Sequence, residues 1–353
     1  MNATDPNLPH RKAFPGGARV ALAHGGGGKA MRDLIARVFV SNFDAAGEGE
    51  DQARLTPPSA LLAGGQLAFT TDSFVVDPLF FPGGDIGKLA VWGTINDLAV
   101  GGAVPQAISA AFIIEEGMEI DILVDVALSM KAAADKAGVA IVTGDTKVVQ
   151  RGGADKLFIT TSGVGTIPPG RCLLARSVRP GDVAIVNNFL GHHGAAILTA
   201  RGEMALDNAI ESDCAPLSSL MEAVIRAAPG IRCARDCTRG GLASALNEIA
   251  QAAGTAIRIE ERALPLRAEI KGFCEVLGFD PLYLANEGTL VVFVPPEQAQ
   301  AALAAMQATD EGRNAHIIGA AIEGIAGRVV MRTAFGGDRI VDMLVGEQLP
   351  RIC

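Results

Sequence analysis

The sequence has neither an excess of positive charge nor a long apolar segment. Its 30 Lys and Arg residues against 39 Asp and Glu residues give a formal net charge of −9, which argues against nonspecific binding to nucleic acid and against docking on anionic lipid. The uncharged run 183–200 contains two Asn and two His residues, and the run 98–114 is interrupted by Pro105. A membrane span needs roughly 20 mostly apolar residues, and the N-terminal residues contain no apolar signal-peptide core. We therefore predict a cytoplasmic protein without a membrane segment.

Cysteine is absent from the first 171 residues, and the six that follow do not form a metal or redox motif. Cys233 and Cys237 lie four positions apart, which is not a zinc-ribbon or thioredoxin spacing, and no second pair completes a site. We predict that five cysteines are packing residues in a reducing compartment. Cys353 is less readily interpreted as a packing residue, because it is the last residue of the sequence.

Length and composition predict a folded chain of two domains. The 353 residues are 49% apolar and 20% charged, so a disordered chain is excluded, and the 42 glycines have no period of three, so collagen is excluded. Strand and helix patterns alternate along the sequence, which indicates an α/β (α+β) fold. We expect strands at 67–71, 139–143, 157–164, 183–188 and 288–294, and helices at 30–43, 86–99, 121–137 and 242–253.

The best linker is the segment 166–171, in which two prolines and a glycine interrupt both patterns. It divides the chain into an N-terminal domain, residues 1–167, and a C-terminal α/β domain, residues 168–334. From about Phe335 the periodic patterns fade, so we predict a C-terminal tail over 335–353 that carries Cys353.

A run of four glycines precedes the first predicted helix. Consecutive glycines let the backbone approach an anion closely, and the start of a helix adds the positive end of its dipole. The order of Gly, Lys and Ser/Thr is not that of a P-loop, and a flexible surface loop remains an alternative. The candidate phosphate-binding residues here are Gly25, Gly26, Gly27, Gly28 and Lys29.

Aspartate recurs beside Gly or Thr where elements begin or end. A single Asp in such a place is often a helix cap or a turn residue, and Asp85 can be read in that way alone. Asp97 differs because it falls on an apolar face of a helix, where a carboxylate needs a partner or a cation. Several carboxylates without His or Cys ligands favour Mg²⁺, which is usually bound together with phosphates. We predict Asp72, Asp97, Asp145 and Asp236 as metal ligands, with Asp72, Asn96, Asp97, Asp145, Thr146 and Lys147 contacting the nucleotide.

These motifs together carry a family resemblance. The segments 70–78 (TTDSFVVDP), 83–88 (GGDIGK), 93–100 (GTINDLAV), 144–149 (GDTKVV), 235–243 (RDCTRGGLA) and 286–288 (NEG), with the final Pro-Arg-Ile-Cys, resemble the HypE family of hydrogenase maturation factors. That family belongs to a superfamily with aminoimidazole ribonucleotide synthetase, selenophosphate synthetase and thiamine-monophosphate kinase. The match runs in order over nearly the whole chain. One departure is Cys237, where the family usually has a small non-thiol residue or Pro.

The resemblance implies a two-domain fold like that of aminoimidazole ribonucleotide synthetase, with a mobile C-terminal tail. It also implies a homodimer with nucleotide near its interface, so that residues 1–167 form the domain for ATP binding and dimerisation. It also implies an enzyme that uses ATP and Mg²⁺ to dehydrate a carbamoyl group on Cys353 to a thiocyanate, the source of cyanide for the iron of [NiFe]-hydrogenases. The implied partners are the carbamoyltransferase HypF, which loads Cys353, and the HypC–HypD complex, which receives the cyanide.

The proposed reaction assigns three catalytic residues. Phosphorylation turns the amide oxygen into a good leaving group, so the protein mainly positions its reactants. Cys353 carries the substrate on a chain end that can move between sites. Glu287 is the candidate general base, with a surface turn acid as the alternative. Lys147 serves the phosphates or the proton transfer, and the sequence leaves both roles open.

Two other classes of function compete with this one. A related enzyme such as selenophosphate synthetase needs a reactive Cys or selenocysteine near the N-terminal glycine loop, and this chain has none there. An aminoimidazole ribonucleotide synthetase would leave the terminal thiol unexplained. A non-catalytic protein that only lends a thiol carrier to metallocentre assembly would leave the aspartate motifs unexplained.

Overall fold

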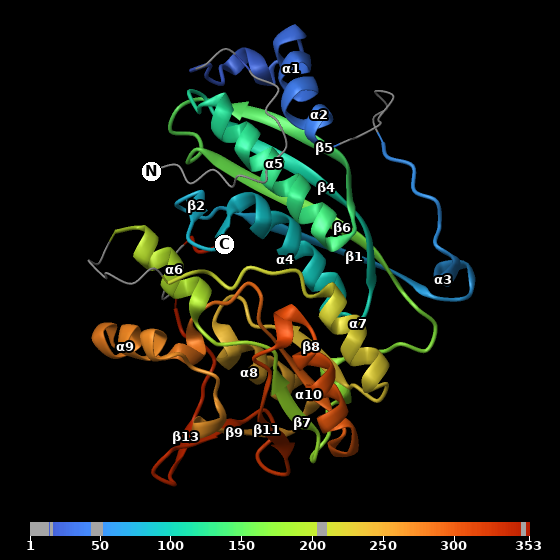
Figure 1. Ribbon diagram of the computed structural model, residues 1–353, viewed down its shortest axis with the longest axis vertical. Helices are drawn as coiled ribbons and strands as arrows, with labels where there is room; N and C mark the ends of the chain where they lie inside the picture. Colours follow the sequence, from blue (N-terminus) through green and yellow to red (C-terminus); the bar gives the residue numbers. More distant parts are fainter. Residues whose placement is uncertain (1–13, 15–16, 44–51, 203–209, 347–350) are drawn as a thin grey trace.

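The structure is a computed structural model, and it describes residue 14 and residues 17–43, 52–202, 210–346 and 351–353. Two α/β units follow one another along the chain, and Figure 1 shows them above and below each other with helix α4 at their junction. Each unit is built on its own sheet, one of four strands and one of seven.

The N-terminal unit contains the strands β1 (Gln66–Phe74), β4 (Val104–Glu115), β5 (Ala140–Val149) and β6 (Leu157–Ile167), the long helices α4 (Ile86–Val100) and α5 (Ile120–Ala137), the short helices α1 (Lys29–Leu34), η2 (Ile35–Val40), α2 (Ser41–Phe43) and α3 (Ser59–Leu62), and the hairpin β2 (Phe80–Phe81) and β3 (Gly84–Asp85). Its sheet has the order β1-β6-β4-β5, so β1 and β5 are the two edges. Helices α4 and α5 cover one face (Figure 1). The opposite face bears the exposed side chains of Leu67, Phe69 and Ile113.

The C-terminal unit contains the strands β7 (Val183–Val186), β8 (Cys233–Asp236), β9 (Ala256–Glu260), β10 (Leu290–Val294), β11 (His316–Ile322), β12 (Val329–Arg332) and β13 (Asp338–Ile340), and the helices α6 (His192–Ala200), α7 (Ser218–Ala227), α8 (Gly241–Ala253), α9 (Ala268–Leu277) and α10 (Ala299–Gln307). Alternate residues of β10 enter different cores: Val291 and Phe293 pack on the side of α8, whereas Leu290 and Val292 pack on the side of α7 and α10. Because successive side chains of a strand point to opposite faces, helices cover this sheet on both sides.

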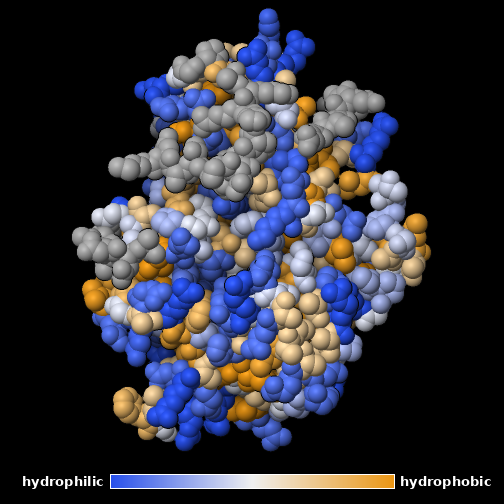
Figure 2. Space-filling model, in the orientation of Figure 1, coloured by the Kyte–Doolittle hydropathy of each residue, from blue (hydrophilic) through white to orange (hydrophobic). Residues whose placement is uncertain are grey.

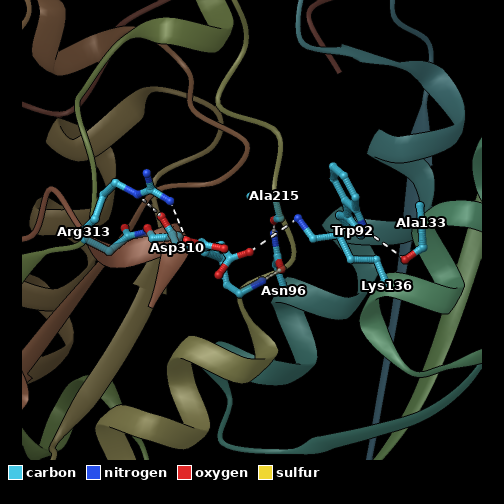
Figure 3. Close-up of polar contacts among 10 residues, drawn as sticks. Trp92, Asn96, Ala133, Lys136, Ala215, Asp310 and Arg313 are labelled. Atoms are coloured by element: carbon cyan, nitrogen blue, oxygen red, sulfur yellow. Dashed lines mark hydrogen bonds and ion pairs between the residues drawn. The ribbon is translucent and has the colours of Figure 1, made fainter. Parts of the chain in front are cut away.

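Helix α4 joins the two units because almost all of its surface is buried, as expected for a helix that is apolar on every side. The Asn96 side chain donates to the carbonyl of Ala215 at 3.0 Å and accepts from the N–H of Leu217 at 2.8 Å. Figure 3 shows this contact and, beside it, Lys136 of α5 reaching toward the other unit, where its partner is Glu311 at 3.5 Å. The cleft described below therefore lies between two units held in register by α4.

Most of the predicted elements are confirmed. The helices expected at 86–99 and 121–137 are α4 and α5, and Gly138 ends α5 with a φ of 69°, a left-handed conformation that glycine adopts readily. The strand predicted at 139–143 is longer than expected, since β5 runs from Ala140 to Val149. The helix predicted at 30–43 forms as three consecutive helical segments.

Two further expectations differ from the structure. The fold does not end at residue 334, because β13 lies within the predicted tail and pairs with β12. Cys172 is exposed and is not a packing residue, whereas Cys233, Cys237 and Cys274 are buried and Cys214 packs against the main core.

In the described part of the chain, none of the helices has the length and apolar character needed to cross a membrane. Hydrophilic and apolar residues are interspersed over the face seen in Figure 2.

Candidate active site

A cleft of about 310 Å³ lies at the junction of the two units and collects acidic side chains from both. Its walls come from β1, α4, the end of β8, the start of α8 and the loop before β10. Its lining residues are Thr71, Asp72, Phe74, Gly93, Asp97, Arg235, Asp236, Thr238, Arg239, Gly241, Ser244, Ala245, Glu248, Glu287 and Cys353.

The N-terminal unit contributes Asp72 and Asp97, which lie on the contacting elements β1 and α4 and both line the cleft. Asp72 lies near the end of β1 and accepts the N–H of Ser73 at 2.8 Å. Asp97, one turn after Gly93 on α4, accepts the hydroxyl of Thr70 at 2.8 Å. A Cβ at Gly93 would come within 2.9 Å of the Phe74 ring, so glycine at this position lets α4 approach β1 closely.

The C-terminal unit contributes Asp236 and Glu287. Asp236 is the last residue of β8, and the glycine-rich turn after it leads into α8. Glu287 is buried in the loop before β10. This loop is fixed by Asp213, whose carboxylate accepts the N–H groups of Glu287 and Gly288, both at 3.0 Å, and the hydroxyl of Thr289 at 2.8 Å. The geometry therefore aims Glu287 into the cleft from a rigid turn.

Burial and mutual repulsion raise the pKa values of the acids in the cleft. Loss of hydration raises the pKa of Asp97 to about 6, and the charges of Asp236 and Asp72 add to this effect. Burial raises the pKa of Asp236. Burial, together with the negative charge of Asp213, raises the pKa of Glu287 well above its usual range. Clustered acids with raised pKa values are typical of functional sites and are stabilised by a bound cation.

The carboxylates of the cleft suit a metal ion that is also coordinated by the phosphates of a bound ligand. Among the described residues, no three acidic, His or Cys side chains converge tightly enough to hold a metal ion by themselves. Mg²⁺ is usually bound by one or two carboxylates plus phosphate and water oxygens. Asp72, Asp97 and Asp236 could supply the carboxylates for such an ion.

The chain end occupies the same cleft. An oxygen of Cys353 accepts the N–H of Val75 at 3.0 Å, and the carbonyl of Arg351 accepts the N–H of Asp77 at 3.4 Å, so residues 351–353 run antiparallel to the segment after β1. The Ile352 side chain is buried in the main core. Burial and the charge of Glu287 raise the pKa of the Cys353 thiol to about 12. The docked thiol is therefore protonated at neutral pH.

The other predicted nucleotide residues lie elsewhere in this chain. Asp145 and Lys147 are on β5, at the opposite edge of the sheet from β1, and pair with each other at 2.9 Å on the exposed face. Gly25 lies against β5, since a Cβ there would come within 2.9 Å of the Val148 nitrogen. The structure thus separates the glycine loop (Gly25–Lys29), Asp145, Thr146 and Lys147 from Asp72, Asp97 and Asp236. Asp145 does not share a metal site with these three acids within one chain.

Asn96 and Asp85 stabilise the fold and are not part of the cleft. The Asn96 side chain is buried, and both its oxygen and its nitrogen are bonded to the C-terminal unit, so it does not reach the cleft. Asp85 caps α4 by accepting the N–H of Lys88 at 3.0 Å, as the simpler of the two interpretations predicted.

Sequence reasoning missed several residues of the cleft. Thr238 and Arg239 stand within the quoted motif 235–243, so the motif itself was a signal for them. Asp213 had none, because it is a single acid outside every quoted motif and acts through backbone groups distant in sequence.

Comparison with known proteins shows the family of this chain. The chain matches the family models of the AIR synthase related protein, N-terminal domain, over residues 49–167, and C-terminal domain, over residues 179–332. It is 67% identical to carbamoyl dehydratase HypE of Rhodobacter capsulatus over 95% of this chain and 98% of that protein. The chain belongs to the carbamoyl dehydratase HypE family.

Solved structures of HypE proteins share this fold over nearly their whole length. A crystal structure of hydrogenase maturation protein HypE in complex with ATP superimposes with a TM-score of 0.89 at 45% identity, covering 94% of this chain and 99% of that one. A HypE–HypF complex gives a TM-score of 0.77 at 43% identity, covering 90% of this chain and 100% of that one. The predicted fold and family are therefore confirmed.

Proposed function

We propose that this protein is an ATP-dependent carbamoyl dehydratase that converts an S-carbamoyl group on Cys353 to a thiocyanate, which supplies cyanide for the iron of [NiFe]-hydrogenase. The observation that carries the proposal is that Cys353 lines one cleft together with Asp72, Asp97, Asp236 and Glu287. A non-catalytic thiol carrier would have no need to hold its thiol among buried acids.

The cofactors of this proposal are ATP and Mg²⁺. Bound Mg-ATP would supply a phosphoryl group for the amide oxygen and charge neutralisation for the carboxylates. Asp72, Asp97 and Asp236 would hold the metal ion, because their carboxylates cluster in the cleft and the pKa values of Asp97 and Asp236 are raised. ATP binding is also supported by the solved relative in complex with ATP.

The residues of the chain position the amide and remove its protons. In the reaction, the S–C(=O)–NH₂ group loses its oxygen to phosphate and both of its N–H protons, which leaves S–C≡N. Glu287 would accept a proton, since a carboxylate with a raised pKa is a stronger base once ionised. The hydrogen bond from Val75 to Cys353 would keep the tail in line with the phosphate site.

The protonation state of the docked Cys353 thiol indicates where a partner protein would load it. A docked thiol with a pKa of about 12 is a poor nucleophile, so the carbamoyl group would be loaded with the tail outside the cleft. HypF is the proposed donor, and a solved relative forms a HypE–HypF complex. The HypC–HypD complex is the proposed cyanide acceptor.

A homodimer would complete the site. The exposed face of the four-stranded sheet carries Leu67 and Phe69, 61% and 69% exposed, and it also carries Asp145 and Lys147 beside Ala111 and Ile113 of the neighbouring strand. A second copy docked on this face would cover the apolar side chains. It would also bring the Lys147 edge of one protomer toward the cleft of the other.

Mass spectrometry of the C-terminal peptide tests the proposed reaction. The chain is incubated with HypF, carbamoyl phosphate and ATP to load Cys353, and the same reaction is run with Cys353→Ala as the control. We expect the carbamoylated peptide to lose the mass of one water with ATP and Mg²⁺ present, and the control to remain unmodified. A carbamoyl group that persists under these conditions would instead favour the non-catalytic thiol carrier.

A further inference from the structure

The chain end is held from one side by a buried histidine that does not line the cleft. His193 is the second residue of α6 and is completely buried. Its Nε2 lies 2.6 Å from the carbonyl oxygen of Ile352, the residue before the reactive Cys353. The tail is also held by backbone groups of residues 75–77, by an ion pair between Arg351 and Asp155, and by Arg201, whose guanidinium donates to the carbonyl of Arg351 at 2.7 Å.

The hydrogen bonds around His193 fix its tautomer. A carbonyl oxygen only accepts, so Nε2 carries a proton and donates it to Ile352. Burial lowers the pKa of His193, so the neutral ring is favoured and Nδ1 is an acceptor. The Ser212 hydroxyl, 2.8 Å from Nδ1, is therefore the donor to it. The same hydroxyl oxygen accepts the N–H of Cys214 at 3.2 Å.

Ser212 is itself held rigidly. Its N–H donates to the carbonyl of Pro82 at 2.9 Å, and Gly83 lies so close that a Cβ would come within 2.6 Å of the Ser212 backbone. The edge of the His193 ring meets Phe81, with the ring centroids 5.5 Å apart and an interplanar angle of 79°. The hairpin of β2 and β3 therefore fixes both the serine and the imidazole.

We propose that His193, oriented by Ser212, is a positioning residue that holds the Ile352 carbonyl and so keeps the Cys353 side chain in the cleft. This inference rests on the proposed function in one respect, namely that the docked position is the one used for dehydration. Loss of the imidazole would leave the buried Ile352 carbonyl without this donor, and a lost donor to a buried acceptor favours the undocked tail.

The docked position is also next to the segment that orients Glu287. Ser212 supports the tail through His193, and the adjacent Asp213 supports the loop of Glu287 through its carboxylate. One short segment therefore sets both the position of the substrate carrier and that of the candidate base. A change at His193 should alter the tail without altering the nucleotide-binding acids.

The test measures the alkylation rate of Cys353 by iodoacetamide in the full-length chain, read by mass spectrometry of its C-terminal peptide. Cys172→Ser serves as the background, because Cys172 is exposed and would consume reagent. We expect His193→Leu to raise the rate about tenfold and Ser212→Ala to raise it several-fold. We expect His193→Gln, whose amide nitrogen can replace Nε2, to stay near the parent. The control is His316→Leu, at an exposed histidine at the start of β11 whose ring contacts the carbonyl of Asn314.

Activity measurements separate the two proposals. With carbamoylated protein and saturating ATP, His193→Leu should dehydrate Cys353 about tenfold more slowly with an unchanged KM for ATP, while loading by HypF is not slowed. Equal alkylation rates in the parent, His193→Leu and Ser212→Ala would overturn the role of His193, whatever the reaction. Faster alkylation in the variants with no dehydration in the parent would support His193 and overturn the proposed function instead. Ser212→Ala keeps the test decisive if His193→Leu does not fold.

Discussion

The carboxylate of Asp213 accepts the backbone N–H of Glu287 at a distance of 3.0 Å. Its second oxygen accepts the N–H of Gly288 and the hydroxyl of Thr289. Charge-assisted hydrogen bonds of this kind are stronger than neutral ones, so they fix the turn from which Glu287 enters the cleft. The negative charge of Asp213 also raises the pKa of Glu287, which makes this acid both a support and an electrostatic partner.

Asp213→Asn should therefore slow the reaction without weakening nucleotide binding. The amide would place an N–H₂ group against backbone donors, so we expect kcat for dehydration to fall about tenfold, with KM for ATP within about twofold. Single-turnover assays on carbamoylated protein would measure kcat. The matched control is Asp310→Asn, at a side chain that is 88% exposed and paired with Arg313 on the surface. A variant with an unchanged kcat would remove Asp213 from this role.

Asp97 should make the stability of the ligand-free protein depend on pH. Because its pKa is raised from 3.8 to about 6 in the fold, its stabilising contribution is fully present below pH 3.8 and is lost as the pH rises through 6. Asp97→Asn should therefore be more stable than the parent at pH 7.5, by up to about 3 kcal/mol, and nearly equal to it at pH 4.

Urea unfolding at the two pH values, without divalent cations, measures this difference in unfolding free energy. Glu323→Gln, at an exposed surface position, is the control. Added Mg²⁺ and ATP should then stabilise the parent more than Asp97→Asn. If Mg²⁺ and ATP raise the unfolding free energy of Asp97→Asn as much as that of the parent, Asp97 does not contribute to the proposed metal site.

The Cys353 thiol should be alkylated abnormally slowly, and its alkylation rate should not reach a plateau as the pH passes the ordinary pKa of a thiol. Its pKa of about 12 in the docked tail, against 9.0 for an unperturbed thiol, means that the protonated form stabilises docking below pH 9 and that docking weakens as the pH rises from 9 toward 12. The alkylation rate should keep rising up to pH 9.5, whereas a free peptide of the same C-terminal sequence begins to level off. A plateau in the intact protein at the same pH as in the peptide would contradict the docked state.

The sequence predicted those features of the site that local chemistry determines. Asp97 was identified because a carboxylate on an apolar helix face needs a partner. The strand predicted at 139–143 was too short, because Gly144 and Asp145 favour turns, whereas pairing with β4 keeps the residues up to Val149 in β5. His193 and Asp213 could not be predicted, since each acts on a backbone group that only the tertiary fold brings near.

Separation of the predicted site residues leads to the last prediction. Lys147 lies on β5 and Glu287 in the cleft on the side of β1, so a catalytic role for Lys147 requires a second protomer. We expect Lys147→Ala and Glu287→Gln each to be inactive as homodimers. When the two variants are mixed and allowed to exchange subunits, each heterodimer would contain one intact site, made from the cleft of one chain and the β5 edge of the other.

With equal amounts of the two variants and random pairing in a two-fold symmetric dimer, about a quarter of parent activity should return. Sedimentation would measure the oligomeric state of the same samples. The control for subunit exchange alone is a mixture of either variant with the double variant that carries both Cys353→Ala and Lys147→Ala. Such a heterodimer contains no intact site. If Lys147 served the cleft of its own chain, both sites of the heterodimer would remain defective, because each chain would lack one of the two groups. If a confirmed heterodimer recovers no activity, the shared site is therefore rejected. Recovered activity would explain why the glycine loop and Lys147 lie on the sheet edge opposite the acids that they are proposed to assist.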